Sequence, residues 1–269
     1  MKIPLYTIDK KEVEKKALPS CFQESIRADL VKRAVLALRA NNRQPYGADP
    51  SAGMKQISKV SRRRRDYQTS YGHGISRAPR KVMARKGTRF TWVGALAAGT
   101  VGGKAAHPPK VEKNWSMKIN KKERKKALRS ALAATMDKEM VTEIGHILPQ
   151  GYPFIVESKF ESLSKTKEVL AILETLGFGP ELARASRKKI RGGRSRLRGR
   201  KYKKATGPLL VVSGACPLLK AAKNIPGVAI VDARYLNAET LAPSVKPGRL
   251  TLFTDAAIAA IEKGKLFSA

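Results

Sequence analysis

The four residues L-L-V-V at Leu209 to Val212 form an unbroken apolar run, which is typical of a strand buried on both faces of a parallel sheet. Similar apolar runs recur at Pro153 to Val156, Val228 to Val231 and Leu250 to Phe253. A segment with helical spacing of apolar residues follows each run. Repeated strand and helix units of this kind predict an α/β fold, a three-layer α/β/α sandwich with a largely parallel sheet of about four strands.

Helices are expected after these strands at Lys165 to Leu176, Pro217 to Lys223, Leu236 to Leu241 and Asp255 to Lys263, the last with Thr254 as N-cap. Earlier in the chain, Ile26 to Ala40 places apolar residues on one face and Arg or Lys on the other, which predicts an amphipathic helix. Asn120 followed by Glu123 is an N-x-x-E capping signal, so a further helix is expected to begin there.

The composition combines a hydrophobic core with a large positive charge. The 269 residues are 42% hydrophobic, yet 55 Lys and Arg stand against 21 Asp and Glu, a net charge of +34. Such an excess needs a polyanion to neutralise it, either nucleic acid or an anionic membrane surface. No apolar run reaches the roughly 20 residues needed to span a bilayer, and Met1 to Lys10 lacks the features of a secretory signal. We therefore expect a cytoplasmic protein that binds nucleic acid and no membrane.

Two segments hold most of the charge. Residues 45–110 contain 14 Lys or Arg and two acidic residues, and residues 187–204 contain 11 Lys or Arg and no acidic residue. Together they carry +23 of the net +34. The expected organisation is a globular α/β domain formed by residues 1–44 and 111–269, with 45–110 as an extended basic loop inserted in it and 187–204 as a second basic insertion.

The first insertion is expected to have no core of its own. It contains nine Gly, five Pro and no sustained helical or strand period. Ordering its 66 residues costs on the order of 100 kcal/mol, which its few apolar side chains cannot offset, so we expect a partner to order it. Arg makes planar, bidentate contacts with phosphates and stacks on exposed bases, which favours nucleic acid over a merely solvated charged face.

Phosphate-loop and nucleophile motifs are not matched. G-T-V-G-G-K-A at Gly99 to Ala105 has one residue too few between its glycines and has Ala where a magnesium ligand is needed. Gly72 to Gly74 lacks the third glycine of a dinucleotide fingerprint. Ser213-Gly214 is not framed as a nucleophile elbow. The glycines of the first two segments, Gly72 to Gly74 and Gly99 to Ala105, are interpreted as flexible loop residues.

Titratable residues do not form a catalytic or metal-binding pattern either. Asp232 and Asp255 follow strands, but we expect Asp232 to start a turn and Asp255 to lie in the first turn of a helix. Cys21 and Cys216 are far apart and match no metal motif, which indicates reduced thiols. The three histidines have no second ligand at a suitable spacing; they are His73, His107 and His146. We therefore expect no catalytic residues, no metal and no cofactor.

Several segments resemble the ribosomal protein L-four family of the large subunit. They are N-N-R-Q-P-Y-G at Asn41 to Gly47, G-G-K-A-A-H-P-P-K at Gly102 to Lys110, K-E-R-K-K-A-L-R-S-A-L-A-A at Lys122 to Ala134, S-K-T-K-E-V-L at Ser164 to Leu170, N-I-P-G-V at Asn224 to Val228 and G-R-L-T-L-F-T at Gly248 to Thr254. The resemblance extends from about Leu18 to Lys263 and is weakest between Ala48 and Gly99. R-G-G-R-S-R-L-R-G-R-K-Y in the second insertion resembles the archaeal and eukaryotic branch.

The resemblance implies a globular domain on the outside of the large subunit and a loop threaded through rRNA. In that family the loop tip reaches the peptide exit tunnel and forms a constriction with ribosomal protein L-twenty-two. Asn41 to Gly47 and Gly102 to Lys110 would then be the two stems of the loop, and the tip would lie near Arg77 to Arg89. The residues expected at the tunnel are Arg80, Lys81, Val82, Met83, Arg85 and Lys86.

The residues expected to bind rRNA are polar and mostly basic side chains of the stems and the two insertions. They are Asn41, Asn42, Arg43, Gln44, Lys55, Lys59, Arg62, Arg63, Arg64, Arg65, Arg77, Arg80, Lys81, Arg85, Lys86, Arg89, Lys104, His107, Lys110, Arg187, Lys188, Lys189, Arg191, Arg194, Arg196, Arg198, Arg200 and Lys201. Aromatic residues expected to stack on unpaired bases are Tyr67, Tyr71, Phe90 and Trp92.

The sequence thus predicts a non-enzymatic structural constituent of the large ribosomal subunit. Its expected partners are large-subunit rRNA and neighbouring ribosomal proteins, with no small-molecule substrate. Two alternatives stay open at this point. One is an RNA-modifying or nucleotide-dependent α/β enzyme with basic insertions, and the other is a protein that binds a regulatory mRNA.

Overall fold

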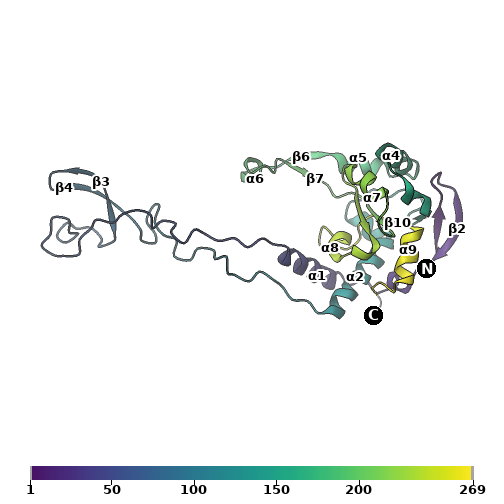
Figure 1. Ribbon diagram of the computed structural model, residues 1–269, viewed down its shortest axis with the longest axis horizontal. Coiled ribbons are helices and arrows are strands. Elements are labelled where there is room, and N and C mark those ends of the chain that lie inside the picture. The colour runs from purple at the N-terminus through teal and green to yellow at the C-terminus, as the bar shows by residue number, and fades with distance from the viewer. Residues whose placement is uncertain (1, 268–269) are drawn as a thin grey trace. The chain divides into compact units, whose positions relative to one another are not determined.

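The computed structural model of the chain describes residues 2–267, and the chain divides into two compact units (Figure 1). We call Arg43–Trp115 the inserted unit, and the residues on either side of it together form the α/β unit. Each unit is described by itself.

Six strands within residues 2–267 form the sheet of the α/β unit, in the order β2-β1-β5-β10-β8-β9. They are β1 (Lys2–Tyr6), β2 (Glu12–Ala17), β5 (Ile155–Val156), β8 (Leu209–Val212), β9 (Ala229–Asp232) and β10 (Thr251–Thr254). Only the β1–β2 pair is antiparallel. The expected α/β fold with a largely parallel sheet is confirmed.

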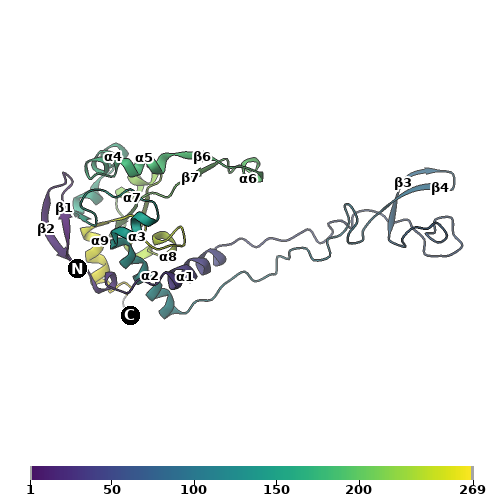
Figure 2. The ribbon, with the colours of Figure 1, turned by 180° about the vertical axis from the view of Figure 1, so that it is seen from behind.

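The hairpin of β1 and β2 is an addition to the expected strands, and it extends the sheet from about four strands to six. Figure 2 shows the two strands side by side. Pro4 lies within β1, and β2 reads E-V-E-K-K-A with mostly exposed side chains. A proline and a charged run both argue against a strand in local sequence. Burial of Ile3 and Leu5 against the rest of the sheet stabilises β1 in spite of this.

The helices of the α/β unit follow the expected order with shifted ends. They are α1 (Ala28–Asn41), α2 (Lys121–Met136), α3 (Lys138–Glu143), α4 (Thr166–Thr175), α5 (Gly179–Ser186), α6 (Arg194–Leu197), α7 (Leu218–Ala221), α8 (Ala238–Leu241) and α9 (Asp255–Lys263). Short 3-10 turns lie at η1 (Ser20–Phe22), η2 (Ser158–Ser162), η3 (Ala222–Asn224) and η4 (Ala233–Tyr235). Helices α5 and α6 are additions to the expected helices, and β5 begins at Ile155, two residues later than the expected start at Pro153.

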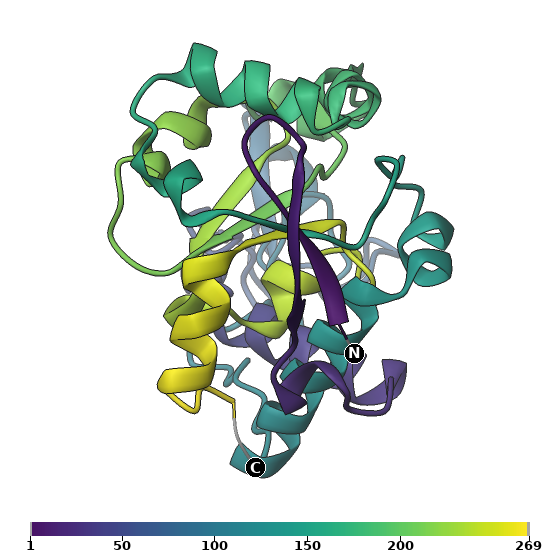
Figure 3. The ribbon, with the colours of Figure 1, turned by 90° about the vertical axis from the view of Figure 1, so that its right-hand side faces the viewer.

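Side chains from alternate positions of β8 enter two separate apolar clusters. Leu209 and Val211 pack with α1, α2, α8 and α9, whereas Leu210 and Val212 pack with α4 and α7. Figure 3 shows α9 on one side of the sheet and α4 on the other. The two clusters establish the three layers, and they explain why the strand is apolar at every position.

Local capping signals of the sequence are confirmed. Asn120 and Glu123 form a reciprocal capping box at the start of α2. Thr254 accepts a hydrogen bond from the backbone of Ala257, so β10 passes directly into α9. Asp232 accepts from the backbone N–H of Arg234 at 2.9 Å. Asp255 lies in the first turn of α9 and forms an ion pair with Lys16 of β2.

The second basic insertion is a hairpin. Strands β6 (Lys188–Ile190) and β7 (Tyr202–Lys204) pair in antiparallel fashion, and α6 lies between them. Every side chain from residue 187 to residue 204 is exposed. The side chains of this hairpin are therefore not part of the apolar core.

The inserted unit contains a second hairpin, formed by β3 (Arg80–Lys86) and β4 (Arg89–Gly94). No sustained strand period was expected in this segment, and these two short strands are an addition to the expected elements. Phe90 and Trp92 alternate with exposed Arg89, Thr91 and Val93 in β4, and Gly87 takes the positive φ that the tight turn requires. The alternation was missed because it covers so few residues.

Candidate nucleic-acid interface

The residues expected to bind RNA are solvent-accessible. All of them are exposed except Arg80 and Lys81, which are partly buried. Within residues 2–267, the inserted unit has a single ion pair, between Lys55 Nζ and Asp49 Oδ2 at 2.8 Å. The remaining cations of this unit therefore form a surface of uncompensated charge, the arrangement that attracts a polyanion.

Some candidate side chains are held by their own hairpin. Arg80 Nη2 donates to Ser76 Oγ at 2.8 Å, Arg85 Nε donates to the carbonyl of Gly87 at 3.0 Å, and Arg191 Nε donates to the carbonyl of Tyr202 at 3.1 Å. Asn41 differs, because its Oδ1 accepts from the backbone N–H of Met117 at 2.9 Å and joins the end of α1 to the segment that precedes α2. These contacts orient guanidinium groups before any ligand is bound.

The aromatic residues expected to stack on bases fall into two groups. Tyr67, Phe90 and Trp92 form one cluster, with ring centroids 5.9 Å apart for Tyr67 and Phe90 and 5.7 Å apart for Phe90 and Trp92. The Arg85 guanidinium lies 5.4 Å from the Phe90 ring. Phe90 and Trp92 are partly buried in this cluster, whereas Tyr67 is 57% exposed and keeps surface for a base. Tyr71 lies apart and contacts Arg77, whose Cζ is 4.3 Å from the ring centroid.

A second aromatic cluster, which the sequence analysis missed, lies between the two stems. Tyr46 and Trp115 stack with centroids 5.5 Å apart and planes inclined by 19°. Arg43 Cζ lies 3.9 Å and Lys113 Nζ 4.4 Å from the Trp115 ring centroid. An aromatic surface flanked by two cations is suited to a nucleobase and its phosphate. A Trp within the polar run V-E-K-N-W-S was the available signal.

Glycines permit the close approach of the stems. The backbone N–H of Ala48 donates to the carbonyl of Pro109 at 2.9 Å, and a Cβ on the adjacent Gly47 would lie 2.6 Å from Val111. Gly53 has φ +75°, and a Cβ there would lie 2.3 Å from the carbonyl oxygen of Gly103. A larger residue at either position would push the two chain segments apart.

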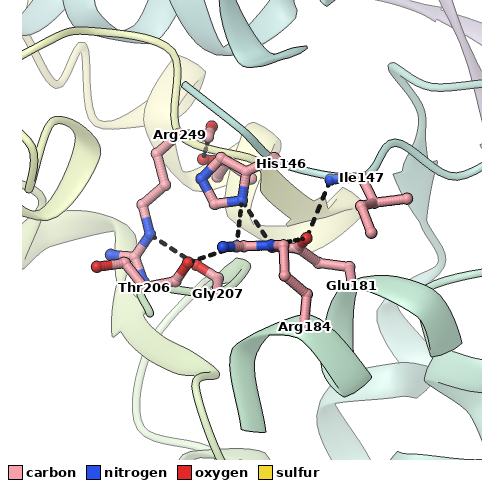
Figure 4. A network of polar contacts seen from close by, with 8 residues as sticks. His146, Ile147, Glu181, Arg184, Thr206, Gly207 and Arg249 are labelled. Atoms are coloured by element: carbon pink, nitrogen blue, oxygen red, sulfur yellow. Dashed lines mark hydrogen bonds and ion pairs between the residues drawn. The ribbon is translucent and has the colours of Figure 1, made fainter. Parts of the chain in front are cut away.

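The α/β unit contains a buried ionic cluster that the sequence analysis also missed (Figure 4). Glu181 of α5 is fully buried. It accepts hydrogen bonds from Arg184 Nε at 2.7 Å and from the backbone N–H of Ile147 at 3.0 Å, and its Oε1 lies 2.6 Å from His146 Nδ1. Burial would raise the pKa of Glu181, but the hydrogen bonds from Arg184 and His146 outweigh it and lower the pKa to about 2. The carboxylate is therefore charged at neutral pH.

Arg249 lies beside this cluster and is nearly fully buried. Its Nε donates to the carbonyl of Gly207 at 3.1 Å and its Nη1 to the carbonyl of Thr240 at 2.8 Å. Burial lowers the pKa of Arg249 to about 10, so it keeps its charge at neutral pH. His146, expected to be an isolated histidine, is thus part of a network of charged side chains.

The carboxyl edge of the sheet carries hydrogen-bonded polar groups. Ser213 Oγ donates to Glu161 Oε2 at 2.6 Å, and Thr254 Oγ1 donates to Glu161 Oε1 at 2.5 Å.

Cys21 and Cys216 are free thiols, and burial raises the pKa of each. In the described part of the chain no cluster of three or more His, Cys, Asp or Glu could hold a metal ion. None of the helices between residues 2 and 267 has the length and apolar character needed to cross a bilayer.

Comparison with known proteins places these features in a family. The model of the ribosomal protein L4/L1 family matches residues 16–264. The chain is 46% identical to the large ribosomal subunit protein uL4 of Nanoarchaeum equitans over 268 residues, which cover 99% of this chain and all of that protein. It is 41% identical to uL4 of Methanopyrus kandleri, covering 98% of both chains, and 40% identical to uL4 of Archaeoglobus fulgidus, covering 96% of this chain and 97% of that protein.

Proposed function

Because the chain belongs to the ribosomal protein L4/L1 family, we propose that it is a non-enzymatic structural constituent of the large ribosomal subunit and binds large-subunit rRNA in the cytoplasm. The observation that carries the proposal is the match along the whole chain, including both basic insertions, to archaeal proteins of the large subunit. Its partners are then rRNA and neighbouring ribosomal proteins.

The inserted unit is the principal RNA-binding element in this proposal. Its cations are exposed, except for the partly buried Arg80 and Lys81, and apart from Lys55 they lack carboxylate partners among residues 2–267. Arg62, Arg63, Arg64 and Arg65 are four consecutive exposed guanidinium groups, enough to contact several phosphates along one strand. Tyr67 lies near Arg85, and the Tyr46–Trp115 stack lies near Arg43 and Lys113, so both provide aromatic surfaces beside cations for unpaired bases.

The β3–β4 hairpin is the part of the inserted unit that we propose to line the peptide exit tunnel, next to ribosomal protein L-twenty-two. Met83 is 62% exposed in β3, and Arg85 and Lys86 are exposed beside the turn at Gly87. Cations at this turn would meet the nascent chain, and Met83 would offer an adaptable apolar contact. A photoreactive residue at Met83 should cross-link to a stalled nascent peptide, whereas one at Tyr235, 76% exposed in the α/β unit, should not. Equal labelling from both positions would contradict tunnel lining.

RNA binding is tested with the full chain and a large-subunit rRNA fragment. For around ten phosphate contacts, affinity should fall by about three to five decades between roughly 50 and 200 mM salt. Replacing Arg62 to Arg65 together by Gln removes four exposed cations and should reduce the slope of log affinity against log salt by about three.

The matched control removes four exposed lysines of the α/β unit that belong to neither insertion, Lys11, Lys15, Lys220 and Lys223, again to Gln. It has the same change in net charge and should leave the slope nearly unchanged. An equal loss in both variants would mean that total charge, rather than the inserted unit, governs binding. Saturable nucleotide binding by the isolated protein would instead favour an enzyme.

A further inference from the structure

A cavity of about 130 Å³ lies beside the buried cluster of the α/β unit. Its lining residues come from four loops and helix ends: Ile144, His146, Arg184, Thr206, Pro243, Ser244, Lys246 and Arg249. Thr206 precedes β8 and Arg249 precedes β10, and these neighbouring strands are parallel. The cavity therefore lies at the amino edge of the sheet, the edge opposite to Ser213 and Thr254.

Three cations and no carboxylate line this cavity. The charge of Arg184 is neutralised by Glu181, because both carboxylate oxygens of Glu181 accept hydrogen bonds from the guanidinium. Lys246 stands at the rim, 71% exposed, and its ion pair with Glu143 is exposed and therefore weak. Arg249 is different. Among the described residues, two of its five N–H donors have hydrogen-bond acceptors, and both acceptors are neutral backbone carbonyls.

A buried guanidinium without a counter-ion is costly, because burial removes its hydration and two carbonyls neutralise its charge only in part. An anion in the cavity would compensate Arg249 and would also meet Arg184 and Lys246. The cavity, at about 130 Å³, has room for several waters, which is enough for one tetrahedral oxyanion.

The location of the cavity connects it with the second basic insertion. Arg184 lies in α5 immediately before residues 187–204, and Thr206 lies immediately after them, so the two residues stand at the root of the β6–β7 hairpin. Arg184 Nη2 donates to the carbonyl of Thr206 at 2.7 Å and joins the two ends of this insertion. An RNA strand that follows the exposed cations of the hairpin would bring its backbone phosphates to the cavity.

We propose that this cavity is a phosphate site, in which Arg249, Arg184 and Lys246 bind one phosphate group. The assignment of that phosphate to an RNA backbone rests on the proposed function, whereas the site itself does not, because free inorganic phosphate has the same chemistry. Contact with the phosphate would anchor the root of the second insertion while its outer cations bind the rest of the RNA strand.

The test uses the full chain and the imidazole signals of its three histidines in NMR spectra at fixed pH and ionic strength. His146 lines the cavity, whereas His73 and His107 belong to the inserted unit and report on weak phosphate binding there. Titration with inorganic phosphate should shift the His146 signal saturably, and chloride at the same ionic strength should not. Ser244→Asp, which places a carboxylate at the exposed rim, and Lys246→Gln should each weaken this response at least tenfold.

Lys223→Gln is the control, because it removes one exposed lysine away from the cavity and should leave the response unchanged. Both rim positions are exposed, so the fold is retained, which circular dichroism checks. If an rRNA fragment shifts the same signal and displaces phosphate, the source is the RNA backbone; if bound phosphate persists with RNA present, the source is free phosphate. Absence of any saturable His146 response to either probe, or an unchanged response in Ser244→Asp, would overturn the site.

Discussion

Glu181→Gln is expected to destabilise the α/β unit strongly, and by an amount that depends on pH. The substitution removes a fully buried carboxylate that binds Arg184, His146 and the backbone N–H of Ile147. The pKa of Glu181 is lowered from its ordinary 4.5 to about 2. That difference corresponds to about 3 kcal/mol of stability at neutral pH, which agrees with the roughly 3 to 5 kcal/mol lost when one partner of a buried pair is removed.

The sign of the pH dependence follows from the lowered pKa. A carboxylate with a lower pKa in the folded protein than in the unfolded protein contributes its full stabilisation above about pH 4.5, and it loses this contribution as the pH falls through about 2. The free-energy difference between wild type and Glu181→Gln should therefore be about 3 kcal/mol at pH 7 and should shrink towards pH 2.

Urea unfolding of the full chain, followed by far-ultraviolet circular dichroism between pH 7 and about pH 2.5, measures this difference. The matched control is Glu168→Gln, which breaks an exposed pair with Lys165 at 3.2 Å and should cost less than about 0.5 kcal/mol at any pH. The reasoning is refuted if Glu181→Gln costs less than about 1 kcal/mol at pH 7, or if its cost is the same at both ends of the pH range.

Two further predictions concern the inserted unit. Gly53→Ala places a Cβ 2.3 Å from the carbonyl oxygen of Gly103, so limited proteolysis should cut the inserted unit faster and rRNA affinity should fall. The control is Gly99→Ala, where φ is also positive, +87°, but the space around the Cβ is open. This variant isolates the effect of φ and should change both readouts much less. Trp115→Ala removes the ring that stacks on Tyr46 and should weaken rRNA binding by roughly 1 to 3 kcal/mol in a filter-binding assay, with partial recovery in Trp115→Phe. Equal proteolysis of the two glycine variants, or wild-type affinity of Trp115→Ala, would contradict these interpretations.

The parallel sheet was predictable because its evidence is local. A strand buried on both faces must be apolar at successive positions, and Leu209 to Val212 satisfies this within one short segment. The capping box of Asn120 and Glu123 is also contained in a few residues. The β1–β2 hairpin was not predictable in the same way, because Pro4 and the charges of β2 oppose a strand locally. Its stability comes from burial of Ile3 and Leu5 and from pairing of β1 with β5.

The positions of charge are likewise a property of the sequence by itself, and they are enough to locate both basic insertions along the chain. What the cations face was decided by the tertiary structure. Tyr46 and Trp115 stack because two segments distant in sequence lie side by side, with contacts that include the hydrogen bond between Ala48 and Pro109. Arg249 lacks a carboxylate and lines a cavity because four separate chain segments meet at one edge of the sheet. Residue type and local spacing determine the charge and the strands, whereas burial and the choice of contact partner depend on residues far away along the chain, which leave no local signal in the sequence.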